Sequence, residues 1–222
     1  MVDRIIDYIS IFLALMLVLP LHEFAHGFAA VKSGDITPKL YKRYTLNPLA
    51  HFDPIGLLCF VFAGFGWAKP MPVNPSNFKN YKWGCFWVSI AGVLTNFLTA
   101  FIIFPIFILS ARIPDFGYFI TVLRRALSYV YSMSLTFCVF NLIPVYPLDG
   151  FRVVEVFNKK RGSVFRFLRE KGIYVLYALF ALSILSDITG IWQLDILGIF
   201  IRFITNYLGK PIFWFWGLIF NG

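Results

Sequence analysis

Charged residues are scarce in this sequence, and cysteines are scarcer still. Only 14% of the 222 residues are Asp, Glu, Lys or Arg, against about 25% in ordinary soluble domains. The three cysteines, Cys59, Cys85 and Cys138, are widely spaced and form no Cys-x-x-Cys motif. This pattern argues against a disulfide framework or a thiolate zinc site. Internal repeats, low-complexity linkers and polar segments long enough for a soluble domain are also missing, so an ordinary soluble protein is excluded.

Long apolar runs take the place of charge. Hydrophobic residues make up 59% of the chain, and its mean hydropathy is +0.74. Three runs reach the roughly 20 residues that a membrane-spanning helix needs: 8–31, which holds one charge, and 84–111 and 126–148, which hold none. The first run is too long for a signal peptide and lacks a cleavage site, so we keep it as a mature helix. The sequence predicts an all-α polytopic membrane protein with five to six transmembrane helices.

The runs indicate a single membrane-embedded domain over residues 1–222. We expect a catalytic core at about 5–155, followed by C-terminal spans and an aromatic tail at 172–222. Expected spans lie at 5–31, 84–110 and 124–144, with one or two more in 172–209 divided near 187–190. Segment 54–68 is apolar but short and rich in glycine, which favours a re-entrant segment. The prolines of 66–75 favour an extended loop or edge strand, and Phe213–Trp216 an interfacial anchor.

Basic residues set the expected topology. The net charge is +9 and the pI about 9.6, which in a soluble protein would suggest a nucleic-acid partner. In a membrane protein the positive-inside rule explains the excess, so we expect contact with the lipid bilayer and none with nucleic acid. The basic loops 32–83 and 150–172 are expected in the cytoplasm, and the N-terminus and loop 111–125 outside. We expect the multi-pass chain in a bacterial cell membrane, and the sequence indicates no oligomeric state.

His22, Glu23 and His26 form an HExxH motif inside the first predicted span. Two histidines four residues apart on a helix project from one face, and this motif is typical of zinc sites in which the glutamate is the general base. The alternative is a pair of core histidines beside a surface glutamate. An ionisable residue within the bilayer is costly and functional by default, so we favour a metal site.

Asp149 is the best candidate for the third protein ligand that a catalytic zinc requires. It closes the uncharged run 126–148, where Pro144 and Pro147 break the helix and Gly150 permits a sharp turn. The alternative is an ordinary turn aspartate at the membrane surface. By the charge-based topology, both this run and the first span run inward, so Asp149 and the HExxH motif reach similar depth on the cytoplasmic side.

Asn96 and Asn141 are polar amides in otherwise apolar spans, and we regard both as candidate catalytic residues. An amide can polarise the scissile carbonyl or grip the substrate backbone. Helix–helix hydrogen bonding is the competing interpretation, since asparagine serves this purpose in membranes. His51 and Asp53 precede the expected re-entrant segment; they shape this segment, approach the site or form an interfacial turn with a cap.

With these motifs in order, the chain resembles the site-2 protease family of intramembrane zinc metalloproteases, in a minimal form without a PDZ or CBS domain. The matching stretches are HEFAH at 22–26, AGVLTN at 91–96 and the Asn–Pro–Leu-Asp-Gly motif ending at Gly150, with looser matches at 47–56 and 66–70. The resemblance implies one Zn²⁺ per chain held by His22, His26 and Asp149, with Glu23 as the base.

The resemblance further implies cleavage within or near the transmembrane segment of another membrane protein. The region around 66–78 would then present this substrate as an added strand. Two other functions compete with this one. The chain could be an inactive membrane protein that binds or transports metal or serves as a scaffold, or a membrane protease that acts on soluble substrates.

Overall fold

The structure, a computed structural model, describes residues 1–63, 68–114, 117–158 and 160–220. Five long helices dominate it: α1 (Val2–Ser33), α4 (Tyr81–Ser110), α5 (Tyr118–Leu142), α7 (Ser163–Thr189) and α8 (Ile196–Phe220). Shorter helices are α2 (Thr37–Leu40), α3 (Pro54–Ala63) and α6 (Asp149–Phe157), joined by three 3-10 turns, η1 (Pro48–Ala50), η2 (Pro75–Asn77) and η3 (Trp192–Leu194). Within the described ranges no strand forms, and one antiparallel bridge joins Phe52 to Ala68. The predicted all-α class is confirmed.

Helices α1, α4, α7 and α8 are long and apolar enough to cross a membrane. Helix α5 has 25 residues, yet it is not among these four, because Arg124, Arg125 and several serines and tyrosines lower its hydropathy. The described part of the chain thus supports a membrane protein with four candidate spans. The total of five to six spans stays a prediction.

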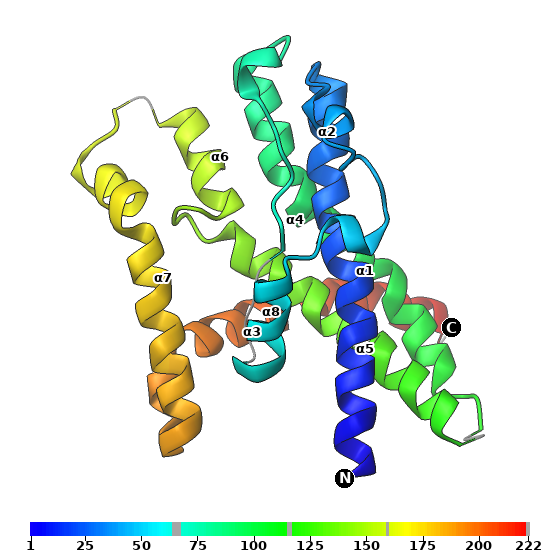
Figure 1. The fold of residues 1–222 in the computed structure, drawn as a ribbon. Coiled ribbons are helices and arrows are strands. Elements are labelled where there is room, and N and C mark those ends of the chain that lie inside the picture. The colour runs from blue at the N-terminus through cyan, green and yellow to red at the C-terminus, as the bar shows by residue number, and fades with distance from the viewer. Residues whose placement is uncertain (64–67, 115–116, 159, 221–222) are drawn as a thin grey trace.

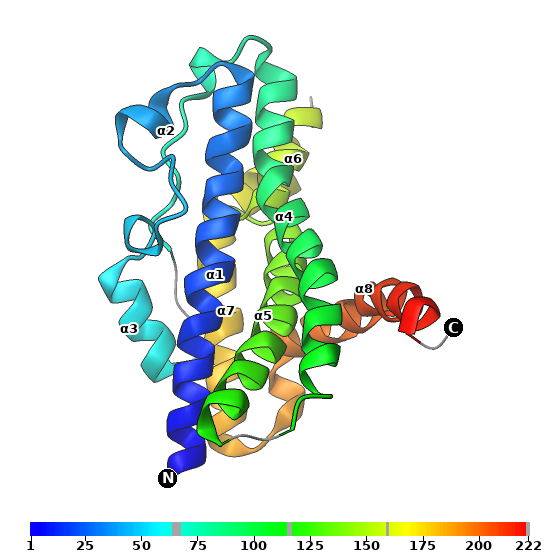
Figure 2. The same ribbon diagram turned by 90° about the vertical axis from the view of Figure 1, so that its right-hand side faces the viewer.

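Helices α1, α4 and α5 form the core of the molecule (Figures 1 and 2). Ala14 and Val18 of α1 are fully buried against Val130 of α5. Ala100 of α4 and Leu135 of α5 are buried in a second cluster. A third cluster joins Ala30 of α1 to Val88 of α4. Close packing of such side chains is a main attraction between helices in a lipid environment, and it holds α1 against α4 where the site lies.

The two ends of this bundle carry different loops. Arg125 at the start of α5 forms ion pairs with Asp3 at 2.8 Å and Asp7 at 2.9 Å, so the N-terminus and the turn before α5 share one end. The C-terminal end of α1, the start of α4 and the start of α7 lie at the other end (Figure 1). This grouping of loops matches the one expected from charge. Which end faces the cytoplasm stays a prediction.

The C-terminal half differs from expectation in two ways. The expected basic loop 150–172 is largely helical, because its arginines and lysines are good helix formers: α6 continues to Phe157 and α7 begins at Ser163. Gly190, with a left-handed φ of 73°, ends α7, and the chain turns into α8, so region 172–209 contributes to two helices. Helix α8 runs across the bundle in both views (Figures 1 and 2). Trp216 of the aromatic tail donates to the Phe101 carbonyl of α4 at 3.0 Å.

The segment expected to be re-entrant contains α3, whose ten residues would extend about 15 Å, too short to cross a bilayer. In Figure 2, α3 lies level with the N-terminal half of α1 and below α2. Just before it, Asp53 accepts a hydrogen bond from the Gly56 amide at 2.9 Å and caps the helix. The buried His51 ring bonds to the Thr45 carbonyl at 2.7 Å. Gly66 and Trp67 of the expected loop lie outside the described residues.

Candidate metal centre

Helix α1 supplies all three residues of the HExxH motif. His22, Glu23 and His26 lie within about three turns of its C-terminal end, and their exposed fractions are 7%, 9% and 8%. The Nε2 atoms of the two histidines lie 3.0 Å apart. Their i and i+4 spacing therefore places two ligand atoms side by side in a buried environment, as helix geometry requires.

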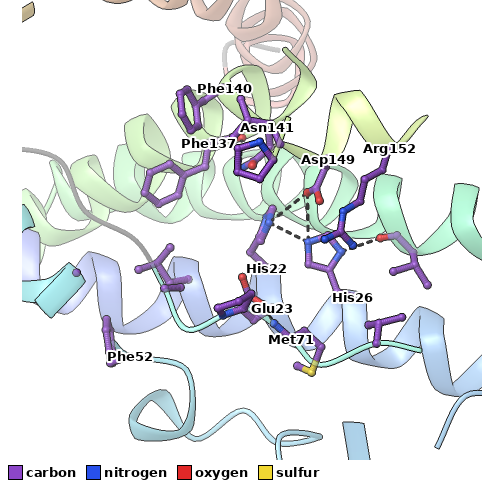
Figure 3. A pocket seen from close by; sticks show the side chains of 18 of the residues that line it. His22, Glu23, His26, Phe52, Met71, Phe137, Phe140, Asn141, Asp149 and Arg152 are labelled. Atoms are coloured by element: carbon purple, nitrogen blue, oxygen red, sulfur yellow. Dashed lines mark hydrogen bonds and ion pairs between the residues drawn. The ribbon is translucent and has the colours of Figure 1, made fainter. Parts of the chain in front are cut away.

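Asp149 reaches the same point from the other side of the pocket. Helix α5 ends at Leu142, the chain turns through 143–148, and α6 begins at Asp149. A Cβ at Gly150 would collide with the Leu142 carbonyl, so only glycine lets α6 fold back this closely on α5. As a result, Asp149 Oδ2 lies 3.4 Å from His22 Nε2 and 3.2 Å from His26 Nε2 (Figure 3).

These three atoms have the spacing of a zinc site. Zinc–nitrogen and zinc–oxygen bonds of about 2.0–2.1 Å in a tetrahedron place ligand atoms about 3.3 Å apart, and the three observed separations are 3.0, 3.2 and 3.4 Å. Apart from these two imidazole nitrogens, the buried Asp149 Oδ2 has no polar partner among the described residues, and a buried carboxylate is costly unless a cation neutralises it. Of the residues that the structure describes, His22, His26 and Asp149 are the group able to hold a metal ion, and their donor set suits zinc.

Glu23 is held by the segment that follows α3. The Met71 amide donates a hydrogen bond of 2.6 Å to Glu23 Oε2. Because Pro70 and Pro72 have no N–H, Met71 carries the only backbone donor of this tripeptide, and the prolines favour its extended conformation. The described residues provide no partner for the other carboxylate oxygen, Oε1. Glu23 is therefore oriented through one carboxylate oxygen only.

The extended segment 68–74 is fastened at two further points. The buried Arg43 donates through Nη2 to the Lys69 carbonyl at 2.5 Å, and the Lys69 amide donates to the His51 carbonyl at 2.8 Å. At its far end, the Asn74 amide donates to Asp35 Oδ2 at 2.7 Å. The Arg43 side chain and the His51 backbone carbonyl thus hold this segment, whereas the His51 ring itself bonds to the Thr45 carbonyl.

Asp35, just after α1, is fully buried and accepts several hydrogen bonds. Burial by itself would raise the pKa of this carboxyl, but hydrogen bonds from Thr37, Asn77 and Asn74 outweigh it and hold the pKa below its ordinary value. The ionised Asp35 therefore joins the end of α1 to both ends of the turn at 74–77.

A cavity of about 500 Å³ contains the metal site. Apolar side chains of α1, α5 and segment 68–74 line most of it, including Leu15, Leu19, Met71, Phe137 and Phe140. Figure 3 shows His22, His26 and Asp149 converging in it, with Glu23 next to Met71. The cavity is thus an apolar pocket with a few polar groups at one point, as is usual for ligand sites.

The two candidate asparagines occupy different positions. Asn141 lines the cavity, and its amide donates to the Phe137 carbonyl of its own helix at 3.1 Å. Asn96 lies outside the cavity, is fully buried, and has its Nδ2 3.0 Å from His22 Nδ1. The structure therefore puts Asn141 at the cavity and Asn96 behind a histidine.

Sequence reasoning missed two further contributions of α4. The Val88 carbonyl lies 2.7 Å from His26 Nδ1. A Cβ at Gly92 would lie 2.5 Å from His22 Cε1 and 2.6 Å from His26 Nε2, so the imidazoles occupy the space that a side chain would need. Positions 88, 92 and 96 are four residues apart and lie on one helix face. The four-residue spacing of Gly92 and Asn96 was the sequence signal from which these contacts of α4 with the histidines could have been predicted.

Two known proteins share most of this region. The chain is 40% identical over 145 residues, 64% of its length, to a Bacillus subtilis protein named "putative zinc metalloprotease YwhC", of which the match covers 66%. It is 26% identical over 161 residues, 68% of its length, to Rip2 of Mycolicibacterium smegmatis, which has the same description and is covered to 60%. The chain thus spans just under two thirds of the length of these relatives.

Protein-family models and solved structures provide no match to the chain. The two relatives carry the identification, and they agree with the donor set that the structure assembles from His22, His26 and Asp149. The resemblance seen in the sequence is confirmed: the chain belongs to the site-2 protease-like family of zinc metalloproteases.

Proposed function

We propose that this protein is an intramembrane zinc endopeptidase that hydrolyses peptide bonds within or near transmembrane segments of other membrane proteins. One observation carries the proposal. Two histidines and an aspartate converge to zinc spacing beside an oriented glutamate, in an apolar cavity among helices of membrane-spanning length. His22, His26 and Asp149 would hold one Zn²⁺ per chain and leave its fourth position open, as catalytic zinc sites do.

The residues of the chain have distinct parts in the reaction. Bound zinc would supply a Lewis acid that lowers the pKa of a water molecule toward about 7. Glu23 takes a proton from the attacking water at Oε1, while Met71 holds Oε2. The water oxygen bonds to the carbonyl carbon, the C–N bond breaks, and Glu23 returns the proton to the leaving amine. Asn141, which lines the cavity, is placed to donate to the substrate carbonyl.

Two features support a transmembrane segment as substrate. Away from the metal-site residues, the cavity walls from α1 and α5 are formed by Leu15, Leu19, Phe137 and Phe140, which suits an apolar chain. In segment 68–74, the amides of Lys69, Met71 and Asn74 are already bonded within the protein. The Val73 amide and the Met71 carbonyl have no partner among the described residues, so they remain available to pair with an unwound substrate strand.

The membrane arrangement that we propose adds α5 to the four helices of spanning length. Helix α3 would dip into the bilayer and return, since it is too short to cross. The basic loops near α2 and α6 would face the cytoplasm of a bacterial cell. The metal site would then lie toward that side, because His26 precedes the end of α1 at Ser33 by about 10 Å.

The test compares the wild type with Glu23→Gln in detergent and in liposomes, using a model transmembrane peptide. The proposal predicts that Glu23→Gln binds one equivalent of zinc and loses cleavage, because its ligands remain and the base is gone. A soluble peptide that contains the same cut sequence serves as a control, and mass spectrometry locates the cut. Equal cleavage by Glu23→Gln would refute the mechanism. Full-rate cleavage of the soluble control would refute the intramembrane substrate.

A further inference from the structure

Asn96 forms a contact between α4 and α1 that involves a metal-ligand candidate. Its Nδ2 lies 3.0 Å from His22 Nδ1, and the two residues are 74 positions apart in the chain. Asn96 is fully buried, so it contacts neither lipid nor the cavity. Its Oδ1 is buried without a hydrogen-bond partner. An amide that uses only one of its two ends in such a place calls for an explanation.

The chemistry of His22 determines which end of the amide it needs. A histidine binds zinc through a bare ring nitrogen, and His22 Nε2 is the atom that faces His26 and Asp149. With Nε2 bare, the proton of a neutral imidazole sits on Nδ1. That proton requires an acceptor, and Asn96 can supply one through Oδ1.

Rotation of the Asn96 amide by 180° exchanges Oδ1 and Nδ2, which are nearly equal in size. One end of the amide lacks a partner in either orientation, so His22 decides between the two. With Oδ1 toward Nδ1, the ring donates to the amide and Nε2 stays free. With Nδ2 toward Nδ1, the amide donates, and the ring proton moves to Nε2, where it blocks the metal.

His26 already shows the arrangement that this argument requires of His22. Its Nδ1 lies 2.7 Å from the Val88 carbonyl, which can only accept a hydrogen bond, so a neutral His26 carries its proton on Nδ1 and leaves Nε2 bare. Val88 and Asn96 are two turns apart on the same face of α4, and His26 and His22 are one turn apart on α1. Gly92 lies between them and leaves space for both rings.

We propose that Asn96 is a positioning residue, which accepts the Nδ1 proton of His22 through Oδ1 and so keeps Nε2 free for the metal. It does this without contacting the substrate. The inference rests on the proposed function to the extent that it takes His22 as a zinc ligand. It replaces the catalytic role considered for Asn96 with an action through His22, of the kind by which partners of ligating histidines set tautomer and orientation.

Zinc affinity of three variants tests the proposal. Asn96→Asp keeps the acceptor and should bind zinc at least as tightly as the wild type. Asn96→Leu has a similar volume without the acceptor and should bind zinc about 10–100-fold more weakly. Thr99→Val is the matched control: its buried hydroxyl lies on the same helix but bonds to the Thr95 carbonyl of α4, so zinc affinity should not change. The unfolding temperature of each metal-stripped variant shows that it is folded.

Two further readouts separate positioning from a structural or substrate-binding role. Saturating zinc should restore the kcat of Asn96→Leu, whereas a lost substrate contact would not be restored. The protein has only three histidines, so ¹⁵N NMR of histidine-labelled, metal-stripped protein can report their tautomers. His22 should carry its proton on Nδ1 in the wild type and shift toward Nε2 in Asn96→Leu.

Wild-type zinc affinity in folded Asn96→Leu, or equal weakening in Asn96→Asp and Asn96→Leu, would overturn the proposal. A wild-type His22 protonated on Nε2 would do the same. Its failure differs from failure of the proposed function. If the wild type binds zinc but cleaves no transmembrane peptide, the proposed function alone is refuted. If the wild type cleaves the peptide and Asn96→Leu binds zinc normally, this inference alone is refuted.

Discussion

The contact between Gly92 and the two imidazoles leads to a specific prediction about an alanine at this position. A Cβ there would lie 2.5 Å from His22 Cε1, whereas ordinary van der Waals contact begins at 3.4 Å. The rings or the helices must therefore move apart by the difference, about 0.9 Å. Metal–ligand distances in a zinc site are expected within about 0.2 Å of their ordinary values. Gly92→Ala should therefore bind zinc at least about tenfold more weakly, which is about 1.4 kcal/mol.

The assay strips the metal from purified protein and titrates zinc back against a chelating dye of known affinity. Gly162→Ala is the control, because a Cβ at Gly162 meets nothing within 4 Å. The control should bind zinc like the wild type. The unfolding temperature of stripped Gly92→Ala shows whether the bundle has survived the added methyl group.

Unchanged zinc affinity in a folded Gly92→Ala protein would refute this reasoning. It would mean either that α4 does not approach the imidazoles so closely or that His22 and His26 do not bind the metal. Loss of zinc in Gly162→Ala as well would indicate that any glycine replacement harms the protein, and the contact would then explain nothing.

Three other changes test separate parts of the site. Asp149→Asn should lower zinc affinity at least about tenfold, because it removes the anionic ligand; unchanged zinc content by mass spectrometry would remove Asp149 from the metal site. Met71→Pro removes the amide that holds Glu23 and should lower kcat about 10–100-fold at unchanged zinc content, from a charge-assisted hydrogen bond of about 1.5–3 kcal/mol. Met71→Ala, which keeps the amide, should retain most activity; equal losses in both variants would assign the effect to the side chain. The lowered pKa of Asp35 means that its contribution to stability is complete above the unfolded pKa near 3.8 and is lost as the pH falls through the lower folded value. In thermal unfolding the wild type should exceed Asp35→Asn above about pH 4, and the difference should shrink in more acidic buffer; a constant difference would contradict this account.

The candidate site was largely predictable because its main signals are local. The HExxH spacing puts His22 and His26 on one face of any helix, whatever surrounds that helix. Asp149 was identifiable because carboxylates are rare in the apolar runs and because prolines and Gly150 mark a turn beside it. The roles of these residues as ligands stay predictions, but the structure brings them together as a metal site requires.

The chain beyond the apolar runs was harder to predict. The charged residues after Asp149 indicated a loop, yet they form α6 and the first turns of α7. Charge indicates whether a segment lies in the membrane or in water, but it says little about whether that segment is helical. The direction of α8 across the bundle likewise has no local signal, since its length and composition are those of a spanning helix.

The sequence by itself determined that this is an all-helical membrane protein with a zinc-type motif, because hydropathy and helical spacing are properties of short stretches of chain. Only the tertiary structure decided what surrounds that motif. Gly92 and Asn96 face the imidazoles because α4 packs against α1 in one register, and Met71 reaches Glu23 because segment 68–74 is fastened by Arg43 and Asp35. These contacts join residues far apart in the chain, and such partners are chosen by packing between elements rather than by the spacing within any one of them.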